Sequence, residues 1–508
     1  MISPQWPSYL VGILVILHIQ GSVGLQKYRP NVLFLIVDDL RPQIGCFEDN
    51  ASTPIHTPNL DHLADRSILF RRAYVQQAVC SPSRTSLLTG RRPDTTRVHD
   101  LTQYWRHAGG NFTTLPQYFK ENGYATAGLG KVFHPGRASG NNDPPSWTED
   151  YFKPDETYWQ DRNRHSWLAA SEAELREHPL PDMQIADAAV KTMTRLADNR
   201  EVPFFLAVGF LKPHLPFLFP SRFLDLYPPG NVSLPSNPFA PVDLPEVAWS
   251  NFDELRKYDD VLDRFGHGTF NTTLPKQFVL DLRRAYYSSV SYVDHLIGTV
   301  LDAASRLGLD NNTIISVLGD HGYQLGEHAE WCKHTNFEIA TRAPLMLSIP
   351  ELPTIRARTD ALVELVDVFP TIAEAAGLPV PDLCSENSTS VPLCVEGVSL
   401  LRLAGDPKRQ WKRAAFSQYP RMLVSGDVLM GYTARTDRYR FTEWIFYDTL
   451  EFRPLWEKKR EYVELYDHVM DPDENVNVAS WDRYADEVQR LRKELREGWR
   501  KALPPPVE

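Results

Sequence analysis

Short hydrophobic runs recur along the chain and alternate with segments of helical periodicity. The run Asn31–Leu40, NVLFLIVDDL, is apolar until it ends in two aspartates, as is typical of a strand buried on both faces of a parallel sheet. Apolar residues are spaced as in helices at Phe278–Leu301 and Ala361–Ala376. Further strands are expected at Tyr124–Leu129, Pro203–Phe210, Thr313–Leu318 and Pro344–Ile349. This alternation predicts an α/β fold whose sheet is covered by helices on both faces.

Polar residues follow four of these predicted strands directly. They are Asp38 and Asp39, Lys131 and His134, Lys212 and His214, and Asp320 and His321. In open α/β sheets the ligand crevice lies outside the carboxyl ends of the strands. The pattern therefore predicts that carboxylates, lysines and histidines meet at one edge of the sheet.

The character of the chain changes after about residue 397. Tyr432–Ile445 is typical of an exposed antiparallel strand, Glu464–Asn477 is polar and turn-rich, and Trp481–Lys501 has helical spacing with mixed charge. We therefore expect a catalytic domain over residues 25–396 and a smaller C-terminal α+β subdomain with an antiparallel sheet over residues 397–508.

Two long segments rich in proline and charge interrupt the catalytic domain. They are Pro135–Pro181 and Pro228–Pro275, and both are too long for simple connections. We expect them to be loops that pack around the entrance of the site.

The N-terminal residues 1–24 contain an apolar run followed by small residues, which predicts a secretory signal peptide cleaved near Gly24. The alternative is an ordinary N-terminal helix. No later run approaches about 18 consecutive apolar residues, so no membrane insertion of the mature chain is expected. Asn-X-Ser/Thr acceptors also favour export, and they begin at Asn50, Asn111, Asn231, Asn271, Asn311 and Asn387.

Composition narrows the classes of protein that remain. With 42% hydrophobic and 23% charged residues the chain is globular, which excludes disorder, collagen and coiled coil. Its net charge of −11 argues against non-specific nucleic-acid binding, and protonation of its 15 histidines would shift that charge upward in an acidic compartment. Five cysteines are too few for a disulfide scaffold. We expect one disulfide, Cys384–Cys394, and free thiols at Cys46 and Cys332.

The aspartates at the strand ends suggest a metal site. Asp38, Asp39 and Asp320, together with His321, supply mainly carboxylate oxygens, which favour Ca²⁺ or Mg²⁺ over zinc. An Asp-Asp pair alone is as often a helix N-cap. The metal interpretation gains weight from the motif that follows.

The most specific local pattern is CSPSR at Cys80–Arg84, continued by TGR at Thr89–Arg91. Seven fixed residue types of this kind would recur by chance on the order of once in a billion positions. Pro82 and Ser83 can start a helix whose N-terminus faces an anion near residue 80, and Arg84 lies one turn on. Without these neighbours, Cys80 would be expected to be a small buried hydrophobic residue.

This motif resembles the Cys-X-Pro-Ser-Arg signature of the type I sulfatases. The resemblance implies an alkaline-phosphatase-like fold, and it implies that a formylglycine-generating enzyme oxidises Cys80 to formylglycine. It also implies one bound Ca²⁺ at Asp38, Asp39, residue 80, Asp320 and His321, although the broader family has Asn where this chain has His321. The remaining catalytic residues would be Arg84, Lys131, His134, His214 and Lys333.

The resemblance implies a reaction sequence for sulfate esters. A hydroxyl of the hydrated formylglycine attacks sulfur, His214 or Lys333 protonates the departing sugar oxygen, and His134 takes a proton from the second hydroxyl. The division of acid and base roles between the two histidines stays open. The roles of His328 and His334 stay open as well.

Longer stretches, among them LIVDDLRP (Leu35–Pro42) and GKVFHPG (Gly130–Gly136), are similar to one branch of this family. That branch removes the 2-sulfate from non-reducing terminal L-iduronate of heparan sulfate and dermatan sulfate in lysosomes. Arg41 and Tyr323 are candidate contacts to the uronate, and Arg41 could equally be a salt-bridge partner. The similarity weakens in Arg137–Pro181.

Three other functions fit parts of the pattern. They are another exo-acting glycosaminoglycan sulfatase, a phosphodiesterase or phosphonate hydrolase of the same fold, and a non-catalytic glycosaminoglycan-binding protein. Relative turnover of sulfated and phosphorylated aryl esters separates the first two. Substitution of Cys80 separates an enzyme from a binding protein.

Overall fold

The computed structural model describes residues 29–48, 55–160, 162, 164–250, 254–350, 352, 357–458 and 462–505. The predicted signal peptide and the acceptor Asn50 lie outside these residues. Among the described helices, none combines the length and the apolar character needed to cross a membrane.

A large mixed β-sheet forms the centre of the molecule, with strand order β10-β2-β11-β7-β1-β5-β3 and β12 paired to β2. β7, β1, β5 and β3 run parallel, whereas β11 is antiparallel to both β7 and β2. The strands are β1 (Asn31–Val37), β2 (Ile68–Tyr74), β3 (Ala125–Gly130), β5 (Phe204–Phe210), β7 (Thr313–Gly319), β10 (Arg342–Ala343), β11 (Leu345–Ser348) and β12 (Ala357–Glu364).

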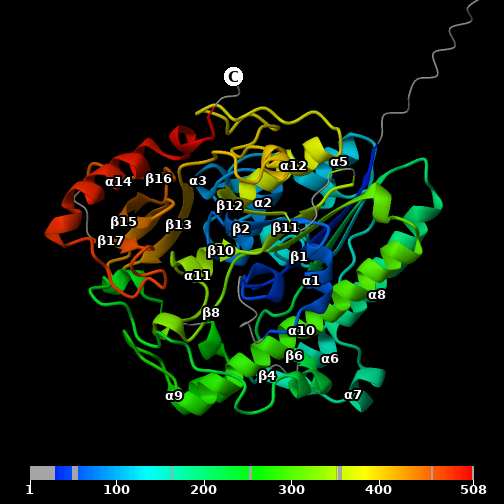
Figure 1. The fold of residues 1–508 in the computed structure, drawn as a ribbon, viewed down its shortest axis with the longest axis horizontal. Coiled ribbons are helices and arrows are strands. Elements are labelled where there is room, and N and C mark those ends of the chain that lie inside the picture. The colour runs from blue at the N-terminus through cyan, green and yellow to red at the C-terminus, as the bar shows by residue number, and fades with distance from the viewer. Residues whose placement is uncertain are drawn as a thin grey trace, which may run out of the picture.

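Helices cover both faces of this sheet, as expected (Figure 1). Leu33, Leu35 and Val37 of β1 join the core under α1, α8 and α10. The alternate residues Val32 and Phe34 join the core under α2, α5 and α12. The helices are α1 (Pro58–Ala64), α2 (Cys80–Thr89), α3 (Pro93–Thr96), α4 (Trp105–Ala108), α5 (Leu115–Glu121), α6 (Thr157–Gln160), α7 (Glu172–Glu177), α8 (Pro181–Asp198), α9 (Asp259–Phe265), α10 (Lys276–Arg306), α11 (Glu338–Thr341), α12 (Val368–Ala375), α13 (Leu401–Gly405) and α14 (Ala485–Glu497).

The helix expected over Ala361–Ala376 is wrong in its first part. Residues 357–364 form β12, which pairs in parallel with β2, and the helix α12 begins only at Val368. The boundary is set by a capping box in which the side chains of Glu364 and Asp367 each accept a hydrogen bond from the other residue's backbone. Strand pairing therefore overrides the helical spacing of the apolar residues.

The C-terminal subdomain is an antiparallel sheet covered by α14, seen at the left of Figure 1. Its outer face packs on α14 through Phe441 and Leu491, and its inner residue Trp444 belongs to the core of the large sheet. The strands are β13 (Ala415–Met422), β14 (Val428–Arg435), β15 (Tyr439–Asp448), β16 (Arg453–Pro454) and β17 (Tyr462–Asp467). Four short strands form two further two-stranded sheets, one from β4 (Trp167–Ala170) with β6 (Phe217–Pro220) and one from β8 (Gln324–Leu325) with β9 (Trp331–Cys332).

One local prediction for this subdomain is wrong. Tyr432–Ile445 is not one exposed strand, because β14 and β15 share it and most of their residues are buried between α14 and the large sheet. Glu464–Asn477 begins within the strand β17 and then continues through turns, so it is turn-rich as predicted. The predicted disulfide Cys384–Cys394 and the free thiols of Cys46 and Cys332 are confirmed.

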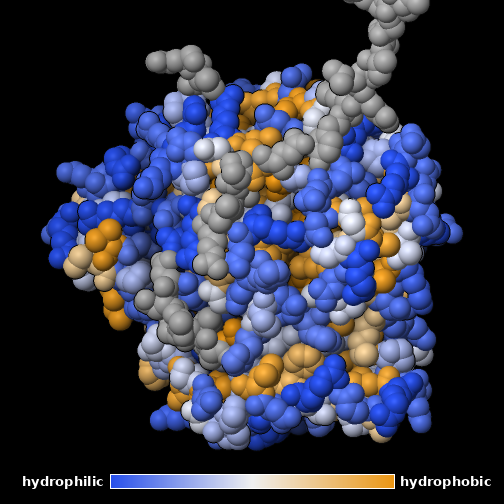
Figure 2. Space-filling view, turned by 45° about the vertical axis from the view of Figure 1, so that its right-hand side comes forward, coloured by the Kyte–Doolittle hydropathy of each residue, from blue (hydrophilic) through white to orange (hydrophobic). Residues whose placement is uncertain are grey.

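The view in Figure 2 shows mainly hydrophilic residues, with hydrophobic residues gathered in smaller patches between them. The apolar side chains with high exposed fractions include Val424 and Met422 at the β13–β14 hairpin. Isolated apolar residues of this kind are normal on a protein surface.

Candidate active site

A cavity of about 820 Å³ opens where the parallel strands end. It is lined by residues that follow the strands or begin α2, and by residues of β13 and of the long segment before α10. The lining includes Cys80, Lys131, His134, His214, Lys333, His334, Glu246, Trp249, Glu254, Lys257, Phe270, Tyr419 and Arg421. The segment Pro228–Pro275 therefore lines the entrance as predicted, whereas none of the described residues of Pro135–Pro181 does.

Cys80 is the first residue of α2 and is 2% exposed. Its Sγ atom lies 3.5 Å from Asp38 Oδ1 and 3.6 Å from Lys131 Nζ. Burial and Asp38 raise the pKa of the thiol, but the ammonium groups of Lys131 and Lys333 outweigh them and bring that pKa well below its usual value. A helix N-terminus also favours negative charge. The position is therefore electropositive and suited to an anion.

Arg84, one turn along α2, is fully buried and joins two strand ends. Its Nη2 atom donates to Asp38 Oδ1 at 3.0 Å, and its Nε atom donates to Asp320 Oδ2 at 2.9 Å. The same guanidinium also donates to the Lys131 and Val132 carbonyls. The hydrogen bonds of Arg84 thus fix the carboxylates around Cys80.

Asp38, Asp39 and His321 converge with Cys80 at the ends of β1 and β7. One potential ligand atom from each of these four residues lies within 4.8 Å of the others, and all four residues are buried. The Nε2 atom of His321 is buried and has no hydrogen-bond partner among the described residues. This nitrogen, which lies 3.5 Å from Asp320 Oδ2, and the carboxylates fit a hard divalent cation.

Asp320 lies beside this group, but other residues engage its carboxylate. Its Oδ1 atom accepts from the Asp39 backbone N–H at 3.0 Å, and Arg84 donates to Oδ2. Burial raises the pKa of Asp320 to about 7. For Asp38, Lys131 and Arg84 outweigh the effect of burial and hold the pKa well below its usual value.

The predicted cationic residues meet in the same cavity. Lys131 forms a buried ion pair with Asp38, and Lys333 Nζ lies 2.9 Å from Asp39 Oδ1. His134 and His214 line the cavity, and the His134 Nδ1 atom is buried without a hydrogen-bond partner among the described residues. Burial lowers the pKa of His214, yet the aspartates Asp39 and Asp38 contribute to raising it to about 10.

Glu254 was not predicted from the sequence, although it is central to this arrangement. Its carboxylate lies 3.0 Å from His214 Nε2, 2.9 Å from Lys333 Nζ and 2.9 Å from His334 Nε2. Within the long loop it is one of several acidic residues, so nothing in the sequence distinguishes it. His334, left open above, enters the site through this contact and through Tyr419, whose hydroxyl lies 2.7 Å from Nδ1.

Arg41 and Tyr323 do not reach the cavity. Arg41 is buried and forms an ion pair with Glu327 at 3.1 Å, which agrees with the salt-bridge alternative. Tyr323 is also buried, donates to Cys332 Sγ at 3.3 Å and stacks on Tyr286. Neither side chain is positioned to contact a uronate in this cavity.

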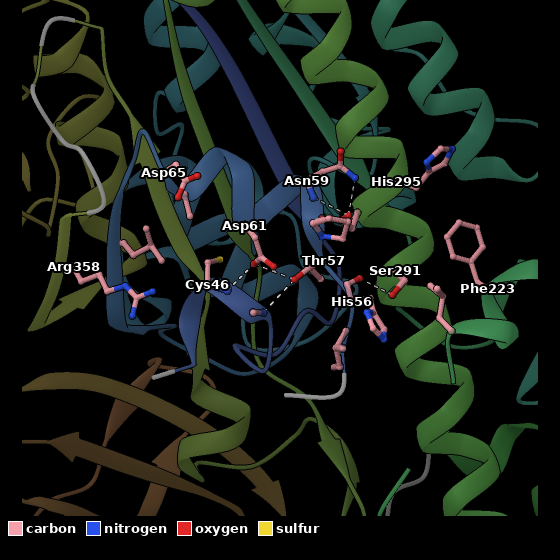
Figure 3. A pocket seen from close by; sticks show the side chains of 17 residues that line it. Cys46, His56, Thr57, Asn59, Asp61, Asp65, Phe223, Ser291, His295 and Arg358 are labelled. Atoms are coloured by element: carbon pink, nitrogen blue, oxygen red, sulfur yellow. Dashed lines mark hydrogen bonds between the residues drawn. The ribbon is translucent and has the colours of Figure 1, made fainter. Parts of the chain in front are cut away.

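A second hollow of about 710 Å³ lies between α1 and α10, around Cys46, Asp61 and Ser291 (Figure 3). Its polar groups bind one another: Asp61 accepts from the Cys46 backbone N–H at 2.7 Å, and Ser291 donates to the His56 carbonyl at 2.7 Å. Burial raises the pKa of the Cys46 thiol. None of the predicted site residues lines this hollow, and its polar groups join structural elements.

Comparison with known proteins agrees with this geometry. The sulfatase family model matches residues 30–378, and the C-terminal model of N-sulphoglucosamine sulphohydrolase matches residues 326–501. Mouse iduronate 2-sulfatase is 39% identical over 521 residues, covering 91% of this chain and 93% of the mouse protein. The human iduronate 2-sulfatase is 39% identical over 481 residues, covering 83% of this chain and 86% of the human protein.

Among solved structures, a phosphonate monoester hydrolase of Agrobacterium radiobacter has a TM-score of 0.70. It is 20% identical, and the match covers 94% of this chain and 96% of the other, so the likeness shows the fold. The predicted alkaline-phosphatase-like architecture with a mostly parallel sheet and an antiparallel C-terminal sheet is confirmed. The chain belongs to the sulfatase family. It is therefore a sulfuric ester hydrolase.

Proposed function

We propose that the protein removes the 2-sulfate from non-reducing terminal L-iduronate 2-sulfate units of heparan sulfate and dermatan sulfate. The observation that carries this proposal is the position of Cys80 at the start of α2, 3.6 Å from Lys131 Nζ, on the wall of a cavity rich in cations. The identity to the mouse and human iduronate 2-sulfatases supports the choice of sugar.

The cavity suits a polyanionic substrate although the whole chain has a net charge of −11. Lys131, Lys333 and His214 surround the position of the sulfate, and Lys257 and Arg421 lie nearer the loop and β13. Arg421 donates to the His334 carbonyl at 2.6 Å and has no carboxylate partner among the described residues. A local cationic field of this kind attracts sulfate and carboxylate groups.

We propose that Asp38, Asp39, Asp320 and His321 hold one Ca²⁺ next to residue 80, and that a formylglycine-generating enzyme converts Cys80 to formylglycine. When bound, the cation would polarise the sulfate oxygens, and the hydrated formylglycine would supply an oxygen nucleophile. The His321 Nε2 atom, which has no hydrogen-bond partner among the described residues, and the carboxylate oxygens of Asp38 and Asp39 support this donor set.

The chain's own side chains then have distinct roles. Lys131 and Lys333 neutralise the sulfuryl oxygens, and Arg84 keeps Asp38 and Asp320 in place through its two hydrogen bonds. His214 or Lys333 protonates the sugar oxygen as it leaves. His134, which lines the same cavity as Cys80, is positioned to accept a proton at residue 80.

We also propose that the chain enters the secretory pathway and reaches the lysosome. The acceptor residues Asn111, Asn231, Asn271, Asn311 and Asn387 are all exposed, which supports glycosylation. The proposal keeps the division into a signal peptide at residues 1–24, a catalytic domain at 25–396 and a C-terminal subdomain at 397–508.

Defined disaccharides test the proposed substrate. The protein, produced with the residue-80 modification, should release sulfate from a non-reducing 2-sulfated iduronate and not from the matching 2-sulfated glucuronate. Equal release from both would defeat the sugar specificity. Because phosphonate hydrolases share the fold, aryl sulfate and aryl phosphonate esters should be compared as well, and a preference for phosphorus would contradict the proposal.

A further inference from the structure

Glu254 connects three cationic or titratable side chains at the cavity wall. Its Oε1 atom is 3.0 Å from His214 Nε2 and 2.9 Å from Lys333 Nζ, and its Oε2 atom is 2.9 Å from His334 Nε2. The Glu254 side chain is only 14% exposed. One carboxylate oxygen therefore lies between the two candidate donors of the leaving-group proton.

Each of the two donors has further hydrogen-bond partners besides Glu254. His214 Nδ1 lies 2.5 Å from the Leu215 carbonyl, which can only accept, so both ring nitrogens of His214 face acceptors. Lys333 Nζ binds both carboxylate oxygens of Asp39 in addition to Glu254. Two adjacent cations repel one another unless an anion lies between them. Glu254 provides that anion.

We propose that Glu254 is a positioning residue that holds His214 and Lys333 together as proton donors for the leaving oxygen. This inference rests on the proposed ester hydrolysis. As the sulfuryl group transfers to the nucleophilic oxygen at residue 80, the sulfur–oxygen ester bond breaks and its electron pair stays on the sugar oxygen. That oxygen takes a proton from His214 Nε2 or Lys333 Nζ, and the donor regains a proton from water.

The test compares two leaving groups with the full chain carrying the residue-80 modification. A simple alkyl sulfate and the 2-sulfated iduronate disaccharide have leaving oxygens that need a proton, whereas a nitrophenyl sulfate releases a stable phenolate. Glu254→Gln should lower kcat for the alkyl and sugar sulfates by about 10²-fold and change nitrophenyl sulfate turnover little. Equal losses on both kinds of ester would overturn the inference.

Two further variants separate positioning from general destabilisation. Glu254→Asp keeps the charge and should recover part of the alkyl sulfate turnover. This variant also serves as the test if Glu254→Gln does not fold. No recovery of alkyl sulfate turnover, or a loss shared by both esters, counts against the inference. The matched control is Glu396→Gln, because Glu396 is a buried carboxylate that accepts from the Arg92 N–H and the Thr95 hydroxyl away from the cavity. Any loss of turnover in Glu396→Gln should be the same for the alkyl and the nitrophenyl sulfate.

The same experiment keeps this inference distinct from the proposed substrate. Wild-type turnover of the iduronate disaccharide tests the substrate, whereas the ratio of alkyl to nitrophenyl sulfate turnover across the Glu254 variants tests the positioning role. If the protein does not act on the iduronate disaccharide, the ratio of alkyl to nitrophenyl sulfate turnover can still change across the Glu254 variants. If the protein does act on the disaccharide, that ratio can still stay constant.

Discussion

Cys80 Sγ lies 3.6 Å from Lys131 Nζ, and this ammonium group is itself ion-paired with Asp38. The contact between Cys80 and Lys131 places residue 80 in a buried, electropositive position that a structural thiol would not require. The cationic surroundings can hold an anionic ester and stabilise the charge that develops on its oxygens.

Cys80→Ala should abolish sulfate-ester hydrolysis while the protein remains folded. The substitution removes one small buried atom, so the free energy of unfolding should fall by about 1 kcal/mol. Turnover of nitrophenyl sulfate and thermal unfolding measure the two effects. Cys46→Ala is the matched control because Cys46 is also a free buried thiol, and it should retain activity. Mass spectrometry that finds an intact thiol at residue 80 in fully active protein would contradict the proposed modification.

Arg84→Met should destabilise the protein by about 3–5 kcal/mol, because it leaves two buried carboxylates without their shared cation. Arg84, Asp38 and Asp320 are all fully buried. Denaturant unfolding measures the change. In the control, Arg164→Met removes an exposed ion pair with Asp259 and should change stability by no more than about 0.5 kcal/mol. A comparable loss in the two variants would show that the buried network adds little stability.

The strand ends were predictable because buried parallel strands are continuously apolar and their polar successors meet at one edge. Asp38 follows β1, Lys131 follows β3 and Asp320 follows β7, and the parallel register brings these residues together. The motif at Cys80 added the fourth component. The sequence pattern of buried strands followed by polar residues therefore places most of the candidate site.

Other features depend on contacts that no local pattern contains. The strand β2 was missed because Arg71 and Arg72 interrupt its apolar run, and the fold pairs these arginines with Asp360 and Asp437. Glu254 reaches the site from a long loop whose path is set by packing. Such long-range pairings cannot be deduced from spacing in the sequence.

Removal of divalent cations should lower both activity and stability. If Ca²⁺ binds the folded chain at the carboxylates near residue 80, adding it at 100 times its dissociation constant should raise the free energy of unfolding by about 2.7 kcal/mol. Thermal unfolding of chelator-treated protein, titrated separately with Ca²⁺, Mg²⁺ and Zn²⁺, measures this gain. The oxygen-rich donor set predicts that Ca²⁺ restores stability better than Zn²⁺. No shift with any of the cations would contradict the metal site.

Asp294 should contribute more to the stability of the protein in acid than near neutrality. Its carboxylate, in α10, accepts from the backbone N–H groups of Asn59 and Leu60 at the start of α1. Burial raises its pKa from 3.8 to about 6. Between about pH 4 and pH 6 the folded state therefore binds more protons than the unfolded state, so this contribution is complete below pH 4 and is lost as the pH rises through 6. The loss amounts to about 3 kcal/mol.

Asp294→Asn removes this titration while keeping the size of the side chain. The difference in free energy of unfolding between wild type and Asp294→Asn should therefore move by about 3 kcal/mol in favour of the variant as the pH rises from about 3 to about 7. Denaturant unfolding at a series of pH values measures the difference, which cancels the other titrating groups that the two proteins share. A constant difference across this range would mean that Asp294 titrates alike in the folded and unfolded chains, which would contradict the prediction.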